Sequence, residues 1–172
     1  MKSHDAIDVS LLVLRMALGL TMAAHGQQKF FAGGRIEGTA RWFDGMGMKP
    51  GRFHALTAAS TEVGSGLMLA MGLLTPFAAA AFVGLMFVAG WTVHRPNGFF
   101  SVRSGWELNF ILAVTAGCLA GVGPGRWSLD RAVGIDDTLF GWLGLAIAFG
   151  LGLSAAIALL AVFYRPPAQS SG

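Results

Sequence analysis

Two charged residues stand inside apolar stretches of the sequence, Arg15 and Glu62. An ionisable residue inside a membrane segment is costly unless it finds a partner, and such residues are often functional. At a rise of 1.5 Å per residue, Arg15 lies about 15 Å along a helix from His25, and Glu62 about 12 Å from His54. If both histidines mark the same membrane face, the two charges have similar depths. We therefore predict an Arg15–Glu62 ion pair. It either forms the bottom of a polar pocket or only fixes the register of two helices.

Polar residues at the ends of the apolar stretches complete the candidate site. Imidazole, ammonium and carboxyl groups can transfer protons and stabilise a developing negative charge. Taken singly, each of these residues is equally well explained as an interfacial side chain whose charged end reaches water. The predicted catalytic residues are His25, Lys29 and Glu62, and the predicted ligand-binding residues are Arg15, His94, Glu107 and Trp91.

Aromatic residues are concentrated on the same predicted membrane face, namely Phe30, Phe31, Trp42, Phe43, Trp91, Phe99, Phe100 and Trp106. An interfacial aromatic belt explains them. The alternative is a site for a flat apolar ligand such as a quinone, entering from the lipid between helices. His25 and His94 are also conceivable as a metal or haem pair. The sequence has no CxxCH motif, no HExxH motif and no cysteine cluster, so no metal is predicted.

The composition shows what must hold these residues in place. Hydrophobic residues make up 54% of the 172 residues and charged residues only 12%, where a soluble domain has about a quarter. Much of the surface must therefore face lipid, and we predict an all-α, polytopic transmembrane helix bundle. The net charge of +3 comes from scattered Lys and Arg residues without a basic stripe, so no nucleic-acid binding is predicted. The single cysteine, Cys118, cannot form an intramolecular disulfide or a CxxC pair.

Five apolar stretches are long enough to be membrane helices, since about twenty residues span a bilayer. They are Asp8–His25, Ala55–Leu74, Pro76–His94, Trp106–Val122 and Leu139–Tyr164. A proline at the start of the third predicts a tight hairpin with the second. The connection of residues 26–54 mixes aromatic residues with glycines, so part of it is predicted to lie in the interface or to re-enter the bundle. Gly141, Gly144, Gly150 and Gly152 are candidates for a packing face on the fifth helix.

Alternation of five antiparallel helices places the first and third connections and the C-terminus on one side. That side carries Lys29, Arg35, Arg41, Lys49, Arg52, Arg95, Arg103 and Arg165, whereas the other carries Lys2, Arg126 and Arg131. The positive-inside rule therefore places the His-rich face and the C-terminus in the cytoplasm.

Four segments in order carry a family resemblance: LRMALGLTMAAHGQQKFF, ARWFDGMGM, TEVGSGLMLAMGLLTPFAAA and ELNFILAVTAGCLAGVGPGRWSLD. Over Val9 to Asp130 the chain resembles the DoxX family of small bacterial membrane proteins. The family pattern falls on Arg15, His25, Gly26 and Lys29; on Glu62, Gly66, Gly72 and Thr75; and on Gly123, Gly125, Ser128, Leu129 and Asp130.

The resemblance implies a four-helix membrane domain over residues 1–138. The chain departs from the family by an additional helix at 139–164, and the residues of the tail at 165–172 predict disorder. It also implies a bacterial inner-membrane location and a link to quinone-coupled oxidoreduction. Some members are the membrane subunit of a thiosulfate:quinone oxidoreductase, and others associate with a superoxide dismutase and a sulfurtransferase in defence against oxidative stress.

The leading hypothesis is therefore an integral membrane subunit of a quinone-linked or oxidant-defence oxidoreductase system, in which quinone is the candidate cofactor. Whether this chain is itself catalytic stays open. One alternative is a non-enzymatic scaffold that recruits soluble redox enzymes to the bilayer, with the fifth helix as a partner contact or a homo-oligomer interface. Another is a small-solute or proton pathway, although no inverted repeat is visible.

Overall fold

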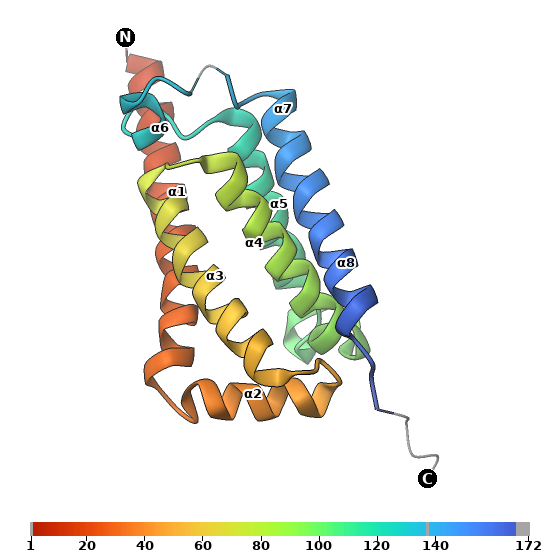
Figure 1. The fold of residues 1–172 in the computed structure, drawn as a ribbon. Helices are drawn as coiled ribbons and strands as arrows, with labels where there is room; N and C mark the ends of the chain where they lie inside the picture. Colours follow the sequence, from red (N-terminus) through yellow and green to blue (C-terminus); the bar gives the residue numbers. More distant parts are fainter. Residues whose placement is uncertain (1, 137, 168–172) are drawn as a thin grey trace.

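The computed structural model describes residues 2–136 and 138–167 and consists of helices joined by short connections (Figure 1). Five helical rods run side by side. They are α1 (Lys2–Phe31), α3 (Gly51–Met71), α4 (Thr75–Ala89) with the π-helical η1 (Gly90–His94), α5 (Glu107–Val122), and α7 (Trp142–Leu145) with the π-helical η4 (Ala146–Leu151) and α8 (Gly152–Phe163). Between them lie α2 (Arg35–Met46), η2 (Arg95–Asn97), η3 (Ser101–Arg103) and α6 (Leu129–Ala132). The prediction of an all-α polytopic bundle is confirmed.

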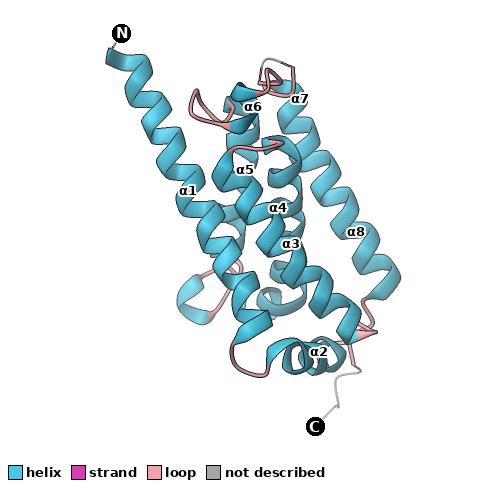
Figure 2. Cartoon of the chain, turned by 60° about the vertical axis from the view of Figure 1, so that its left-hand side comes forward, coloured by secondary structure: helices cyan, strands magenta, loops and turns pink. Residues whose placement is uncertain are grey.

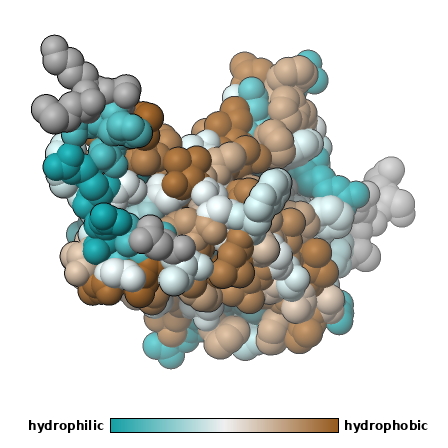
Figure 3. Space-filling view, turned by 90° about the horizontal axis from the view of Figure 1, so that it is seen from above, coloured by the Kyte–Doolittle hydropathy of each residue, from teal (hydrophilic) through white to brown (hydrophobic). Residues whose placement is uncertain are grey.

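The helices suit a membrane by length and composition. Within the described residues, three segments are long and apolar enough to cross it, His4–Phe31, Thr75–Asn97 and Trp142–Phe163, and α5 is a shorter apolar helix. Helix α3 is as long but carries hydroxyl groups and Glu62. Seen from the end that holds the N-terminus, hydrophobic residues reach the outer sides of the bundle (Figure 3). Exposed Val13, Ile111 and Ile157 are examples of side chains that lipid would cover.

The first helix is longer than predicted, and the connection after it contains a helix. α1 continues to Phe31, and α2 then lies across the end of the bundle (Figures 1 and 2). Ala40 and Phe43 of α2 are buried against the bundle, whereas Arg41 and Trp42 are exposed. This arrangement shifts the level at which α1 and α3 meet, and the interfacial position of the segment stays a prediction.

The hairpin between α3 and α4 forms where the sequence predicts it. Gly72 ends α3 in the left-handed conformation, with φ 63°, and Pro76 stands in the first turn of α4. Glycine is preferred at such a helix end because it has no Cβ to clash, and proline at a helix start has no N–H to leave unpaired. Thr75 and Pro76 are both buried, so this turn is packed by other segments.

Glycines let α1 and α3 approach closely. A methyl group at Gly66 would lie 2.5 Å from the carbonyl oxygen of Gly19 and 2.6 Å from the amide nitrogen of Ala23. Farther along, Gly26 faces Ala59 and Val63 in the same way. The two backbones therefore touch over several turns, which is typical of helices that pack in membranes.

The last rod packs against α4 inside the same chain. A methyl group at Gly152 would lie 2.5 Å from the carbonyl oxygen of Ala80. Gly144 approaches α5 similarly, but nothing lies within 4 Å of the positions that side chains at Gly141 and Gly150 would occupy. An isolated antiparallel bridge joins Met48 to Tyr164, and the amide of Arg165 donates to Gly47, 2.8 Å away. Of the predicted disordered tail, residues 168–172 lie outside the described part.

We predict that Gly66→Ala lowers the free energy of unfolding by about 1–3 kcal/mol, because the added methyl group forces α1 and α3 apart. Gly64→Ala on the same helix is the matched control, since nothing lies within 4 Å of its added methyl group. Thermal unfolding in detergent, followed by circular dichroism, measures both. Equal effects of the two substitutions would contradict the close approach.

Candidate functional site

Arg15 lies in the interior of the bundle, and its two terminal nitrogens bind neighbouring segments, whereas its Nε has no hydrogen-bond partner among the described residues. Only 2% of the residue is exposed. Its two terminal nitrogens donate to the carbonyl oxygens of Ala70, at the end of α3, and of Trp127, in the connection before α6. The carboxylate of Asp130 interacts electrostatically with the guanidinium. The charge therefore ties α1 to two segments that follow it by 55 and 112 residues.

Asp130 is completely buried and holds the start of α4. Its Oδ1 accepts from the amide of Leu74 at 2.6 Å, and its Oδ2 accepts from the amide and hydroxyl of Thr75 at 2.9 and 2.7 Å. The amide of Asp130 donates to Gly72 at 2.8 Å. A carboxylate at a helix N-terminus satisfies otherwise unpaired N–H groups and is stabilised by the helix dipole. We call Arg15, Asp130 and Thr75 the Arg15–Asp130 latch.

Glu62 pairs with Lys29. The ammonium of Lys29 donates to Oε2 of Glu62, and the side chains are 23% and 11% exposed. The pair joins α1 to α3 near the end of the bundle where α2 lies. Because little of either side chain reaches solvent, the pair is screened less than a surface salt bridge.

The predicted Arg15–Glu62 ion pair is wrong. The prediction assumed that His25 and His54 are level, but α1 extends to Phe31 and Gly26 packs against Ala59 and Val63. Glu62 is therefore level with the region of His25, whereas Arg15 is level with Ala70. The two charges differ in depth by about ten residues, or 15 Å.

The other predicted site residues occupy the same end of the bundle without forming one cluster. His25 is exposed on α1. Nδ1 of His94 lies 2.7 Å from the carbonyl oxygen of Ser104, and Oε2 of Glu107 accepts from the amide of Ser101 at 2.8 Å. His94 and Glu107 therefore shape the connection between η1 and α5.

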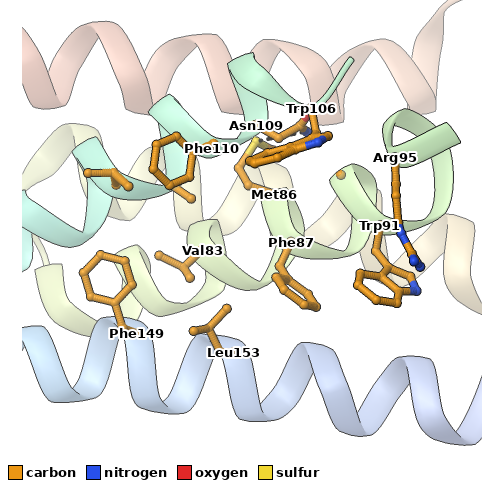
Figure 4. A pocket seen from close by; sticks show the side chains of 13 residues that line it. Val83, Met86, Phe87, Trp91, Arg95, Trp106, Asn109, Phe110, Phe149 and Leu153 are labelled. Carbon is orange, nitrogen blue, oxygen red and sulfur yellow. Dashed lines mark hydrogen bonds between the residues drawn. The ribbon is translucent and has the colours of Figure 1, made fainter. Parts of the chain in front are cut away.

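Trp91 lines a cavity of about 460 Å³ between α4, α5 and α8, which we call the α4–α5–α8 cavity (Figure 4). Its walls are formed by Phe87 and Trp91 from the α4–η1 rod, Trp106 and Phe110 beside or in α5, and Phe149 from η4. The rings of Phe87 and Trp91 are stacked, with centroids 6.0 Å apart. Such a volume, with mostly apolar walls, is typical of a small-molecule site.

Two polar side chains, Arg95 and Asn109, are part of the mostly apolar lining of the cavity. The guanidinium of Arg95 lies 4.1 Å from the centre of the Trp91 ring, so the cation stacks on the aromatic face at one end. Asn109 adds an amide to the lining. These groups can donate hydrogen bonds to oxygen atoms of a flat ligand between the rings. Among the described residues, no three His, Cys, Asp or Glu side chains gather as they would around a metal ion.

The sequence analysis singled out Trp91 and Trp106 but did not propose Arg95, Asn109, Phe110 or Phe149 as site residues. The spacing of most of these residues in the sequence could have indicated that they share a site. Trp91 and Arg95 are four residues apart, and Trp106 precedes Asn109 and Phe110 by three and four, spacings that put side chains on one helix face. Phe149 carried no such signal, because its ring packs over Gly117 of another helix.

Residues 10–95 match the family model described as DoxX. An uncharacterized membrane protein of Mycobacterium tuberculosis is 30% identical over 142 residues, which cover 77% of this chain and 86% of that protein. The chain belongs to the DoxX family. An uncharacterized protein of Haemophilus influenzae is 29% identical over 133 residues, covering 73% of this chain and 83% of that one. No solved structure gave a significant match.

Membership of the DoxX family makes this a membrane protein, and it confirms the resemblance found in the sequence. The matched segment contains Arg15, Glu62 and Thr75 and ends at Arg95. In the structure these DoxX-type residues have packing partners: Arg15 and Thr75 belong to the latch, and Glu62 belongs to the pair with Lys29.

We predict that Asp130→Ala lowers the free energy of unfolding by about 3–5 kcal/mol, because the buried amides of Leu74 and Thr75 and the hydroxyl of Thr75 lose their acceptor and a negative charge near Arg15 is removed. Asp5→Ala is the control, since the Asp5–Arg126 pair is about half exposed on both sides and contributes little. Apparent Tm in detergent measures the difference. A Tm of Asp130→Ala equal to that of the control would exclude the latch.

We also predict that Lys29 and Glu62 are energetically coupled. Lys29→Met or Glu62→Leu alone leaves one largely buried charge unpaired, so each single variant is expected to be less stable than the double variant. The comparison pair is Arg15→Gln with Glu62→Leu, whose effects should add because the residues lie at different depths. If Glu62 were energetically coupled to Arg15 and not to Lys29, the result would support the Arg15–Glu62 ion pair predicted from the sequence instead.

Proposed function

We propose that this DoxX protein is the membrane subunit of a quinone-linked oxidoreductase system in the bacterial inner membrane, and that the quinone ring binds in the α4–α5–α8 cavity. The observation that carries the proposal is an aromatic cavity of about 460 Å³ with a guanidinium at one end. Aromatic walls suit a planar ring, and Arg95 and Asn109 suit its carbonyl oxygens. Because a quinone carries its own redox chemistry, the protein need supply only binding, orientation and protons.

Reduction of a quinone to a quinol takes two electrons and two protons. In this proposal the electrons come from a soluble redox enzyme docked at the membrane. Protons pass through the group formed by His25, Lys29 and Glu62, which is at the same end of the bundle as Trp91 and Arg95. This role is supported by the Lys29–Glu62 pair, which is largely buried, and by His25, which is exposed one helical turn before Lys29 on α1.

A second candidate function is a scaffold that recruits soluble enzymes, such as a superoxide dismutase or a sulfurtransferase. The observation in its favour is α2, which lies across the end of the bundle with an exposed charged side. Arg52 and Glu37 form an exposed ion pair there, 3.2 Å apart. A homo-oligomer through the exposed side of α8, which carries Ile157 and Val162, belongs to the same proposal.

The orientation of the bundle is also proposed. Basic residues are concentrated at the α2 end, so this end and the C-terminus face the cytoplasm in our proposal. A soluble cytoplasmic enzyme would then meet α2 and the His25 end directly.

We predict that the purified protein in lipid nanodiscs binds decylubiquinone, and that Trp91→Ala or Arg95→Gln weakens binding roughly five- to tenfold, because each removes one partner of the Trp91–Arg95 stack. Equilibrium dialysis measures the bound quinone. Trp142→Ala is the matched control, because Trp142 is 87% exposed and does not line the cavity.

Equal affinity of the Trp91 and control variants would contradict the proposed site. Retention of a soluble redox enzyme in mild detergent, without any bound quinone, would instead favour the scaffold.

A further inference from the structure

A second hollow lies on the other side of α4, between α3 and α8. It has a volume of about 440 Å³, and we call it the α3–α8 groove. Many of its lining residues are small, including Ala81 and Gly84 of α4 and Ala155 of α8. Along α4 it reaches from Phe77 to Val88, about 16 Å at the rise of an α-helix. Phe43 and Phe77 also line the hollow. A hollow of this length that is lined mainly by small and aliphatic residues fits a hydrocarbon chain better than a planar ring.

His54 stands at the end of the groove near α2. Only 3% of the residue is exposed, and its Nε2 has no hydrogen-bond partner among the described residues. The imidazole is enclosed by aromatic rings, with centroids 4.9 Å from Phe163, 5.2 Å from Phe53 and 6.0 Å from Phe43. Burying a polar atom without a hydrogen-bond partner costs free energy, so a bound group that pairs with this nitrogen would be stabilised.

The surroundings of His54 indicate what that partner must offer. A neutral imidazole presents either an acceptor or a donor at Nε2, depending on its tautomer. A hydroxyl can pair with both, and it donates to Nε2 when the ring proton is on Nδ1. A carboxylate would instead bring a charge among three phenyl rings, which is unfavourable.

We propose that the α3–α8 groove binds a single-chain lipid whose hydroxyl head group donates a hydrogen bond to Nε2 of His54. The chain lies along the small residues of α4 and α8, and the head group lies at the α2 end, where polar lipid groups are found in a bilayer. Thr57 is one helical turn from His54 and also lines the groove, so it offers a second hydroxyl contact. The site is separate from the quinone cavity and does not depend on the proposed function.

Glycerol monooleate and methyl oleate are suitable probes, because they share a chain but only the first has hydroxyl donors. We expect the intact protein in nanodiscs to bind one glycerol monooleate, and methyl oleate roughly five- to tenfold more weakly. His54→Phe keeps a ring among the neighbouring phenyl groups and removes the acceptor. It should lower the affinity for glycerol monooleate to that for methyl oleate and leave methyl oleate unchanged. Ala81→Leu, which fills the groove, should weaken both. Native mass spectrometry counts the bound molecules.

Thr115→Val on α5 is the control, because Thr115 lies outside the groove and bonds only within its own helix. Equal affinity of the wild-type protein for the two probes would overturn the proposal, even if the His54 variant failed to fold. A difference between the probes that persists in His54→Phe would overturn it as well. Decylubiquinone binding should not change in His54→Phe, so the failure of this site and that of the quinone site are distinguishable.

Discussion

The fold depends on one buried charge and the groups that compensate it. A guanidinium in the apolar interior is tolerated only when acceptors and a counter-charge surround it. For Arg15 these come from the end of α3, from the connection before α6, and from Asp130. Asp130 in turn caps α4 through Leu74 and Thr75. One electrostatic requirement thus fixes the relative positions of three parts of the chain that are far apart in the sequence: α1, the α3–α4 hairpin and residues 127–130.

Helix α4 is the element on which both hollows are built. One side of it carries Met86 and Phe87 and lines the α4–α5–α8 cavity, and another carries Ala81 and Gly84 and lines the α3–α8 groove. The difference in side-chain size gives the two hollows different linings, one with the stacked rings of Phe87 and Trp91 and one with mainly small and aliphatic residues. Trp91 lies in the π-helical η1 that follows α4, and Arg95 comes directly after it. π-helical segments of this kind recur at functional sites.

Local signals in the sequence predicted the helices well, and non-local relations were predicted poorly. Gly72 and Pro76 indicated the hairpin between α3 and α4, because their backbone preferences act within a few residues. The partners of Arg15 and Glu62 depended instead on how far α1 slides along α3, and that register is set by the contacts of Gly19, Gly26 and Gly66. Because the register of α1 against α3 differs by a few turns from the predicted one, Lys29 and not Arg15 is the partner of Glu62. Asp130 was noticed only through the family pattern, since its partners lie more than fifty residues away.

The last rod, formed by α7, η4 and α8, contributes one wall to each hollow, so the order of membrane insertion affects when the hollows form. Phe149 and Leu153 close the first hollow, and Ala155 and Leu159 close the second. Translation and membrane insertion proceed from the N-terminus, so α1 to α5 enter the bilayer while both hollows are still open clefts filled by lipid tails. Docking of the final helix must expel those tails or trap one. The bridge between Met48 and Tyr164 then joins the segment after α8 to an early segment, so this contact forms only after α8 has been made.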